Sequence, residues 1–335
     1  MTDDEQTAPD LERAMRTGDV DALNALATAL GDAGQPERAA AVFRVAASFG
    51  DEVAFSNLGT ALVQVGDLEG AAAAYGAAVE LGFSEARVDL AMVLIEEGED
   101  LDRVDDLLTA AAADGEPDAT HQLGLLRLRQ DAVPEAVELL EQAHAEDASG
   151  TVADSLARGY RAAGRLDDAV RLWEEAGAAG YHEAHLGRAF ALEEAGRDDE
   201  AEAAFRAAVE ADVDVAAASW ASALDRLGRT EDAVRVLREA VARGDDSAMI
   251  DLGNRLTERS ETFDEGLYLY RRAIAMGRLH AVTNLAVSIR GRDRGDERAA
   301  ALLRQAAAEG DGLARRHLAP DDEAVGDDPD DDVSP

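Results

Sequence analysis

The chain has 335 residues and a formal net charge of −39, and all of its basic side chains are arginine because the sequence holds no lysine. A surface this acidic repels phosphate backbones and anionic lipid, so we expect neither nucleic acid nor a membrane as a partner. The absence of cysteine excludes a disulfide framework, a thiolate metal site and a cysteine nucleophile. No apolar run approaches the roughly 18 residues of a membrane span, and the acidic start MTDDEQTAPD is unlike a secretory signal, so a cytoplasmic location is expected.

The N-terminal end is predicted to hold a short acidic segment and then a cap. Residues 1–10 are polar and acidic, and we expect them to be disordered. Leu11, Ala14 and Gly18 then follow with the spacing that ends each later repeat unit. Residues 11–19 are therefore predicted to be a half-repeat that caps the N-terminal end of an array.

The repeating pattern is clearest between Ala54 and Gly82, where two short helices are predicted. Apolar residues recur at three- and four-residue steps, the period of one helical face: Ala54, Leu58, Ala61, Leu62 and Val65 in the first helix, and Ala71, Tyr75, Ala78 and Val79 in the second. Gly66-Asp67 supplies the turn between the helices, and Gly82 ends the second helix. Gly59 lies where the paired helix must approach, since only a very small residue lets two backbones come close. Neither helix buries its apolar face alone, so the rest must pack on the next pair.

Copies of this unit fill the chain at a spacing of 32 or 33 residues. The small residue at the Gly59 place recurs as Ala27, Gly59, Ala91, Gly124, Ala157, Ala189, Ala221, Gly253, Ala286 and Ala319. The second helix of each unit carries a large apolar residue at the Tyr75 place: Phe43, Tyr75, Leu108, Leu140, Trp173, Phe205, Leu237, Tyr270 and Leu303. A turn residue, usually glycine, follows seven positions later. This phase, kept across nine units, predicts nine helix hairpins over residues 20–310 that share one elongated core.

These residues resemble the tetratricopeptide repeat family, whose pattern has a bulky residue, Leu-Gly and an aromatic in the first helix, then Ala, Phe and Ala in the second. The matching residues here are Phe55, Leu58-Gly59, Leu62, Ala71, Tyr75 and Ala78. The segments AVARGDDSAMIDLG and AIAMGRLHAVTNLA are more similar to the related Sel1-like repeat. The resemblance covers residues 11–319 and implies an all-α fold, an α-solenoid of antiparallel helix pairs wound into a right-handed superhelix. Arg127 departs from the pattern because it stands where an apolar residue is expected.

The C-terminal end is predicted to mirror the N-terminal one. Residues 311–319 repeat a first helix and are predicted to form a capping helix, which Pro320 ends. Residues 320–335, PDDEAVGDDPDDDVSP, hold eight acidic residues and no basic one, and we expect a disordered tail. A solubilising role and a docking role both stay open for this tail.

No group of residues makes a case for catalysis. A phosphate-binding loop of the Gly-Lys type is impossible without lysine. His182-Glu183-Ala184-His185 is one residue too short for the zinc-protease motif, whose histidines lie one helical turn apart. We therefore expect no enzyme activity, no cofactor and no metal site.

The resemblance implies that the first helices line a concave face along which a partner segment lies. The residues expected to point there are Val88, Met92, Ile95, His121, Leu125, Leu128, Arg129, Asp154, Arg158, Arg161, Leu186, Phe190, Asn254 and Arg290. This apolar strip with arginines beside it suits a protein or peptide segment that has apolar anchors and a carboxylate. The acidic remainder either selects a partner with basic anchors or is simply a solvated surface. Leu125, Leu128 and Phe190 have the alternative of packing between neighbouring helices.

Two functions follow from this pattern. The first is a non-catalytic protein–protein interaction scaffold that binds a partner segment along the concave face. The alternative is a structural or self-assembling repeat protein that acts through its ends or its convex surface. The sequence names neither the partner nor the oligomeric state.

Overall fold

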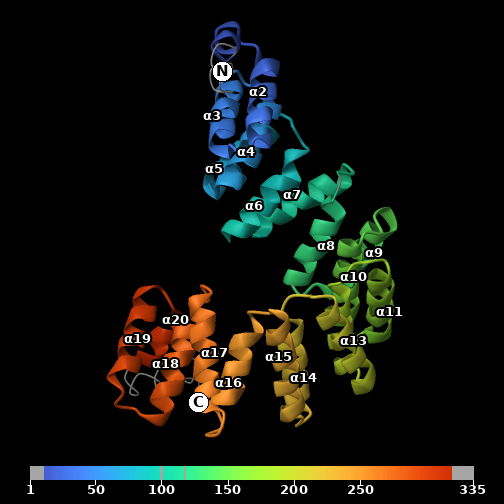
Figure 1. Cartoon of the computed structure of the whole chain (residues 1–335). Helices are drawn as coiled ribbons and strands as arrows, with labels where there is room; N and C mark the ends of the chain where they lie inside the picture. The colour runs from blue at the N-terminus through green and yellow to red at the C-terminus, as the bar shows by residue number, and fades with distance from the viewer. Residues whose placement is uncertain (1–10, 99–100, 117, 319–335) are drawn as a thin grey trace, which may run out of the picture. The chain divides into compact units, whose positions relative to one another are not determined.

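The computed structural model describes residues 11–98, 101–116 and 118–318, so the predicted disordered segments 1–10 and 320–335 and the small residue Ala319 lie outside the described residues. All regular structure in the described part is helical, with no strand, as the sequence predicts. The chain divides into two compact units, residues 1–179 and 180–335 (Figure 1).

The first unit is a row of helix pairs. After a helical stretch at residues 11–17 come α2 (Val20–Asp32) with α3 (Pro36–Ala47), α4 (Glu52–Val65) with α5 (Leu68–Glu80), α6 (Ala86–Glu97) with α7 (Leu101–Ala113), α8 (Ala119–Arg129) with α9 (Val133–Glu146), and α10 (Gly150–Ala162) with α11 (Leu166–Ala178). Each helix from α2 to α10 packs on the next one in the chain, so neighbouring pairs within this unit share their apolar faces.

The second unit continues the same construction. Its helices are α12 (Ala184–Glu194), α13 (Asp198–Glu210), α14 (Ala216–Arg226), α15 (Thr230–Arg243), α16 (Ala248–Thr257), α17 (Phe263–Ala275), α18 (Ala281–Arg292), α19 (Glu297–Ala308) and α20 (Gly312–Leu318). The short α20 packs on α19 and α18 at the end of the row. No helix among the described residues is long and apolar enough to cross a membrane.

Each hairpin is built around a contact between a small and a large residue. A Cβ added to Gly59 would lie 2.7 Å from the Tyr75 ring, and one added to Gly253 would lie 2.7 Å from the Tyr270 ring. The described alanines at this place are fully buried: Ala27, Ala91, Ala157, Ala189, Ala221 and Ala286. The large partners on the second helices are buried as well, from Phe43 to Leu303. The predicted close approach of the two helices is therefore confirmed.

The turns and helix ends follow from the residues that the sequence places there. Asp51 and Asp67 begin α4 and α5 by accepting hydrogen bonds from the backbone amides of Ala54 (2.6 Å) and Gly70 (2.9 Å). Gly66 ends α4 with a φ of 79°, in the left-handed region that glycine enters without strain. The Gly66-Asp67 pair thus stops one helix and starts the next, which fixes the hairpin.

Arg127 departs from the apolar pattern because it joins three helices. Its guanidinium on α8 forms ion pairs with Asp105 on α7 and, at 3.0 Å, with Glu135 on α9. The side chain is only 13% exposed, and its hydrogen bond to Asp105 raises the pKa of Arg127 further. Two carboxylates therefore compensate the charge at a place where the repeat otherwise uses an apolar residue.

Candidate functional site

The first unit has a hollow between its first helices, which we call the α4–α6–α8 hollow. Val63 of α4, Tyr75 of α5 and Arg129 of α8 surround residues of α6: Asp89, Met92, Val93, Ile95 and Glu96. Its volume is about 490 Å³, enough for one or two side chains of a bound segment. Three of the predicted contact residues, Met92, Ile95 and Arg129, meet in this hollow.

The floor of the α4–α6–α8 hollow is apolar and partly open to solvent. Met92 is 41% exposed and Val63 is 38% exposed, whereas Tyr75, which lines the same hollow, is buried. The Tyr75 hydroxyl hydrogen-bonds to Thr60 at 3.0 Å, and burial raises the pKa of Tyr75, so the phenol stays neutral. An exposed methionine beside a fixed aromatic ring gives an adaptable apolar surface.

Charged groups stand around this floor. Asp89 and Glu96 lie on α6, and Arg129 lies at the end of α8. The Asp89 side chain reaches solvent, but the surrounding protein atoms partly desolvate its carboxyl group and so raise the pKa of Asp89. Within the described part of the chain none of the three forms an ion pair, so each is available to a bound segment.

The other predicted contact residues do not line this hollow. The predicted contact residues as a whole vary in exposure: Val88, Ile95, Leu125, Leu128, Leu186, Phe190 and Arg290 are half-buried, and Met92, Arg129, Arg158, Arg161 and Asn254 are exposed. Some of them contact neighbours. Arg158 forms an ion pair with Asp154 at 2.7 Å. Phe190 packs edge-on against Phe205, with ring centroids 5.6 Å apart, which is the packing role left open for it.

His121 and Asp154 differ from the expectation of an accessible contact surface, because both are buried. His121 Nε2 lies 2.8 Å from Ser155 Oγ on α10, and burial lowers the pKa of His121. Asp154 accepts a hydrogen bond from Trp173 Nε1 at 2.7 Å. The helical register gives the direction of each side chain, whereas the size of its neighbours decides whether that direction leads to solvent.

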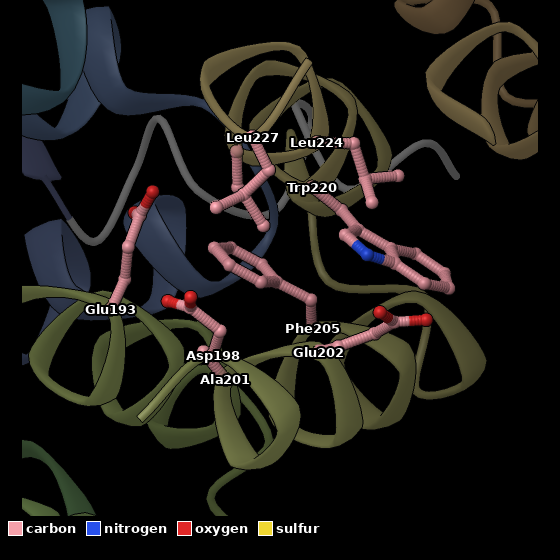
Figure 2. Close-up of a pocket in the computed structure, with 9 residues that line it drawn as sticks. Glu193, Asp198, Ala201, Glu202, Phe205, Trp220, Leu224 and Leu227 are labelled. Carbon is pink, nitrogen blue, oxygen red and sulfur yellow. The ribbon is translucent and has the colours of Figure 1, made fainter. Parts of the chain in front are cut away.

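A smaller pocket in the second unit lies between α13 and α14 (Figure 2). The Phe205 ring lies at its centre below Leu227, with Glu193 and Asp198 on one side and Trp220 above Glu202 on the other. Its free volume is about 20 Å³, room for roughly one water molecule. Glu193 and Glu202 also form ion pairs at 2.6 Å, with Arg226 and Arg229. This pocket is a packing gap rather than a ligand site.

The structure shows no arrangement that would hold a metal ion in the residues it describes. No group of three or more histidine, aspartate or glutamate side chains there has suitable geometry. His182 and His185 are stacked, with ring centroids 6.1 Å apart.

Residues 155–215 match the tetratricopeptide repeat family, and no curated protein matches the chain in sequence. A protective antigen of uropathogenic Escherichia coli that displays an SLR fold is 20% identical with a TM-score of 0.50, covering 92% of this chain and 73% of that one. A tetratricopeptide repeat protein from Parabacteroides merdae is 16% identical with a TM-score of 0.55, covering 70% of this chain and 97% of that one. Yeast Tom70 is 18% identical with a TM-score of 0.57, covering 81% of this chain and 62% of that one.

At these identities the solved structures establish the fold. The family match, the repeat spacing and the paired helices point to one class. The chain therefore has the helical-repeat fold of tetratricopeptide and Sel1-like proteins, and its residues 155–215 match the tetratricopeptide repeat family itself.

Proposed function

We propose that the protein is a non-catalytic interaction scaffold and that a segment of a partner protein binds in the α4–α6–α8 hollow. The observation that carries this proposal is that the exposed side chains of Met92 and Val63 line the same hollow as the buried Tyr75 ring. The hollow lies between first helices, the helices on which proteins of this class hold a bound segment.

The composition of the hollow indicates the chemistry of the partner segment. A large apolar side chain that covers Met92 and Ile95 removes their exposed carbon surface from water. Asp89 and Glu96 give the rim two negative charges against the single positive charge of Arg129. In a chain with a net charge of −39 the long-range field also attracts cations. The segment is therefore an apolar anchor flanked by at least one basic residue.

The test uses the full chain and a phage-displayed library of short random peptides. Enriched peptides should share a large apolar residue next to arginine or lysine. Met92→Asp should weaken their binding about tenfold or more, because an apolar anchor would then meet a carboxylate. The matched control is Met276→Asp, because Met276 is similarly exposed (48%) and lies outside the hollow.

A second pair of variants separates charge from apolar contact. Asp89→Asn with Glu96→Gln should reduce both the affinity and its dependence on salt. Peptides that bind equally well to the wild type and to Met92→Asp would exclude the α4–α6–α8 hollow from the function.

Self-association is the second candidate function, and exposed apolar side chains in the second unit favour it. Tyr268 and Leu279 are each 60% exposed, and Met276 lies between them in the chain. Light scattering over a wide concentration range tests this role, and Tyr268→Glu with Leu279→Glu should abolish any self-association. A monomer at every concentration would exclude it.

A further inference from the structure

The last helices of the second unit enclose a basic hollow, which we call the arginine hollow. Val287, Arg290 and Gly291 of α18 form one side, and Arg294 follows in the turn after α18. Leu303 of α19 and Arg316 and His317 of α20 complete it, and its volume is about 290 Å³. Three guanidinium groups thus meet at one place in a chain whose acidic residues outnumber its basic ones by 71 to 32.

One of these arginines holds the hollow together. Arg290 Nη1 donates a hydrogen bond of 2.8 Å to the backbone carbonyl of His317, which ties α18 to the end of α20. Arg290 is half-buried, whereas Arg294 and Arg316 are exposed. The hydrogen bond therefore fixes the shape of the site, and the other two arginines give it its accessible charge.

Three carboxylates close in sequence to the arginine hollow have hydrogen-bond partners of their own. Asp293, which directly precedes Arg294, accepts from the backbone amide of Gly295 at 2.9 Å. Asp296 begins α19 by accepting from the amides of Arg298 and Ala299, and it also pairs with the Arg298 side chain. Asp311 begins α20 and accepts from the Thr283 hydroxyl at 2.7 Å. Among the described residues no carboxylate forms an ion pair with Arg294 or Arg316. The donor groups of these two guanidinium groups are therefore open to an anion from outside the described residues.

The nearest such anions in the chain follow directly after α20. The segment 320–335 carries eight acidic residues and no basic one, and Asp321 and Asp322 come three and four residues after Leu318. Three extended residues reach roughly 10 Å, so these carboxylates stay within reach of Arg316 and His317. A tethered segment also has an effective local concentration in the millimolar range, which a free ligand rarely matches.

We propose that the acidic segment 320–335 binds in the arginine hollow of its own molecule, with carboxylates placed against Arg294 and Arg316. Guanidinium groups bind carboxylates through paired, charge-assisted hydrogen bonds, so even a few such contacts select the tail over neutral segments. The consequence is a self-occupied basic surface: an acidic segment of another protein reaches these arginines only by displacing the tail. This proposal is independent of the α4–α6–α8 hollow, which belongs to the first unit.

The test measures the distance from the tail to α19. Because the chain has no cysteine, Ala301→Cys on the exposed side of α19 and Ser334→Cys in the tail accept nitroxide labels without competing sites. Pulsed electron–electron double resonance on the full chain should show a short, narrow component in the distribution of distances between the two labels at low salt. That component should disappear at about 1 M salt, where the screening length falls to ~3 Å.

Paired variants locate the contact. Arg294→Gln with Arg316→Gln should abolish the short component, while Arg243→Gln with Arg271→Gln, which removes the same charge from exposed positions on α15 and α17, should leave it. Circular dichroism checks that both pairs keep the fold. A broad distribution in the wild type, or the same distribution in both pairs of variants, would overturn the proposal. A short component that vanishes when labelled protein is diluted with unlabelled protein would place the tail on a second copy and overturn it as well.

Discussion

Replacing Gly59 by alanine tests the contact on which every hairpin depends. The added Cβ would lie 2.7–2.8 Å from three atoms of the Tyr75 ring, whereas carbon atoms in contact prefer about 3.5–4.0 Å. The ring is buried and its hydroxyl is bonded to Thr60, so it has little room to move. Overpacking of this kind costs about 1–3 kcal/mol, and the helix propensity gained from glycine to alanine returns up to ~1 kcal/mol. We expect a net loss of about 1–2 kcal/mol in the free energy of unfolding.

Gly76→Ala is the matched control. Gly76 lies inside α5, and a Cβ there would meet only Arg103 Nη2 at 4.0 Å, an ordinary contact. The free energy of unfolding of this variant should rise by about 0.5–1 kcal/mol, because alanine has a higher helix propensity than glycine and its Cβ meets no steric clash here. Urea unfolding followed by circular dichroism compares the two variants. Amide hydrogen exchange in α4 and α5 provides a local measure, since repeat arrays need not unfold in one step.

Combining Gly59→Ala with Tyr75→Leu tests whether the tyrosine ring causes the loss of stability. In the following hairpin Ala91 and Leu108 occupy the two equivalent places and both are fully buried, so that hairpin accommodates alanine together with leucine. Gly59→Ala should therefore cost less when Tyr75 is replaced by leucine, because a leucine side chain can change rotamer to make room for the added Cβ whereas the tyrosine ring is held in place. A Gly59→Ala protein at least as stable as the wild type, with Tyr75 in place, would refute the packing argument.

Substitutions at three further positions test other features of the structure. Asp154→Ala should lower the free energy of unfolding by about 1–3 kcal/mol in urea titrations, because buried Trp173 Nε1 loses its acceptor, whereas Asp154→Asn keeps an acceptor and should lose less. Burial lowers the pKa of His121 in the folded state, so the unfolded state binds more protons as the pH falls below about 6.5, and the wild type loses stability there. His121→Gln should therefore lose less stability than the wild type over the same pH range, as unfolding curves at several pH values would show. Val215 has a φ of 57°, and Asp118 adopts the same conformation at the equivalent helix start, so Val215→Asn should raise the melting temperature through a gain of about 1 kcal/mol; a lower melting temperature would contradict this reading.

The fold could be predicted from the sequence because its determinants are local. The small residue at the Gly59 place and the large one at the Tyr75 place lie within one hairpin, and their phase recurs throughout the chain. The ion pairs of Arg127 could not be predicted in this way. Its partners Asp105 and Glu135 lie on neighbouring helices, and nothing in the repeat phase pairs them in advance.

The candidate site could be predicted only in part. Met92, Ile95 and Arg129 follow from the register of the first helices, and the same register applied to the preceding repeat gives Val63. The depth of the hollow depends on how successive pairs rotate against each other, a property that no single repeat encodes. His121, directed by the same register, instead meets α10 and is buried.

The glycine–tyrosine contact also limits how such a gene can grow or be shuffled. A duplication with its junction between hairpins copies Gly59 and Tyr75 together and preserves their fit. A junction inside the Gly66-Asp67 turn would join an alanine-bearing first helix to a tyrosine-bearing second one and introduce the overlap that Gly59 avoids. Whole hairpins, rather than single helices, are therefore the units that recombination can exchange.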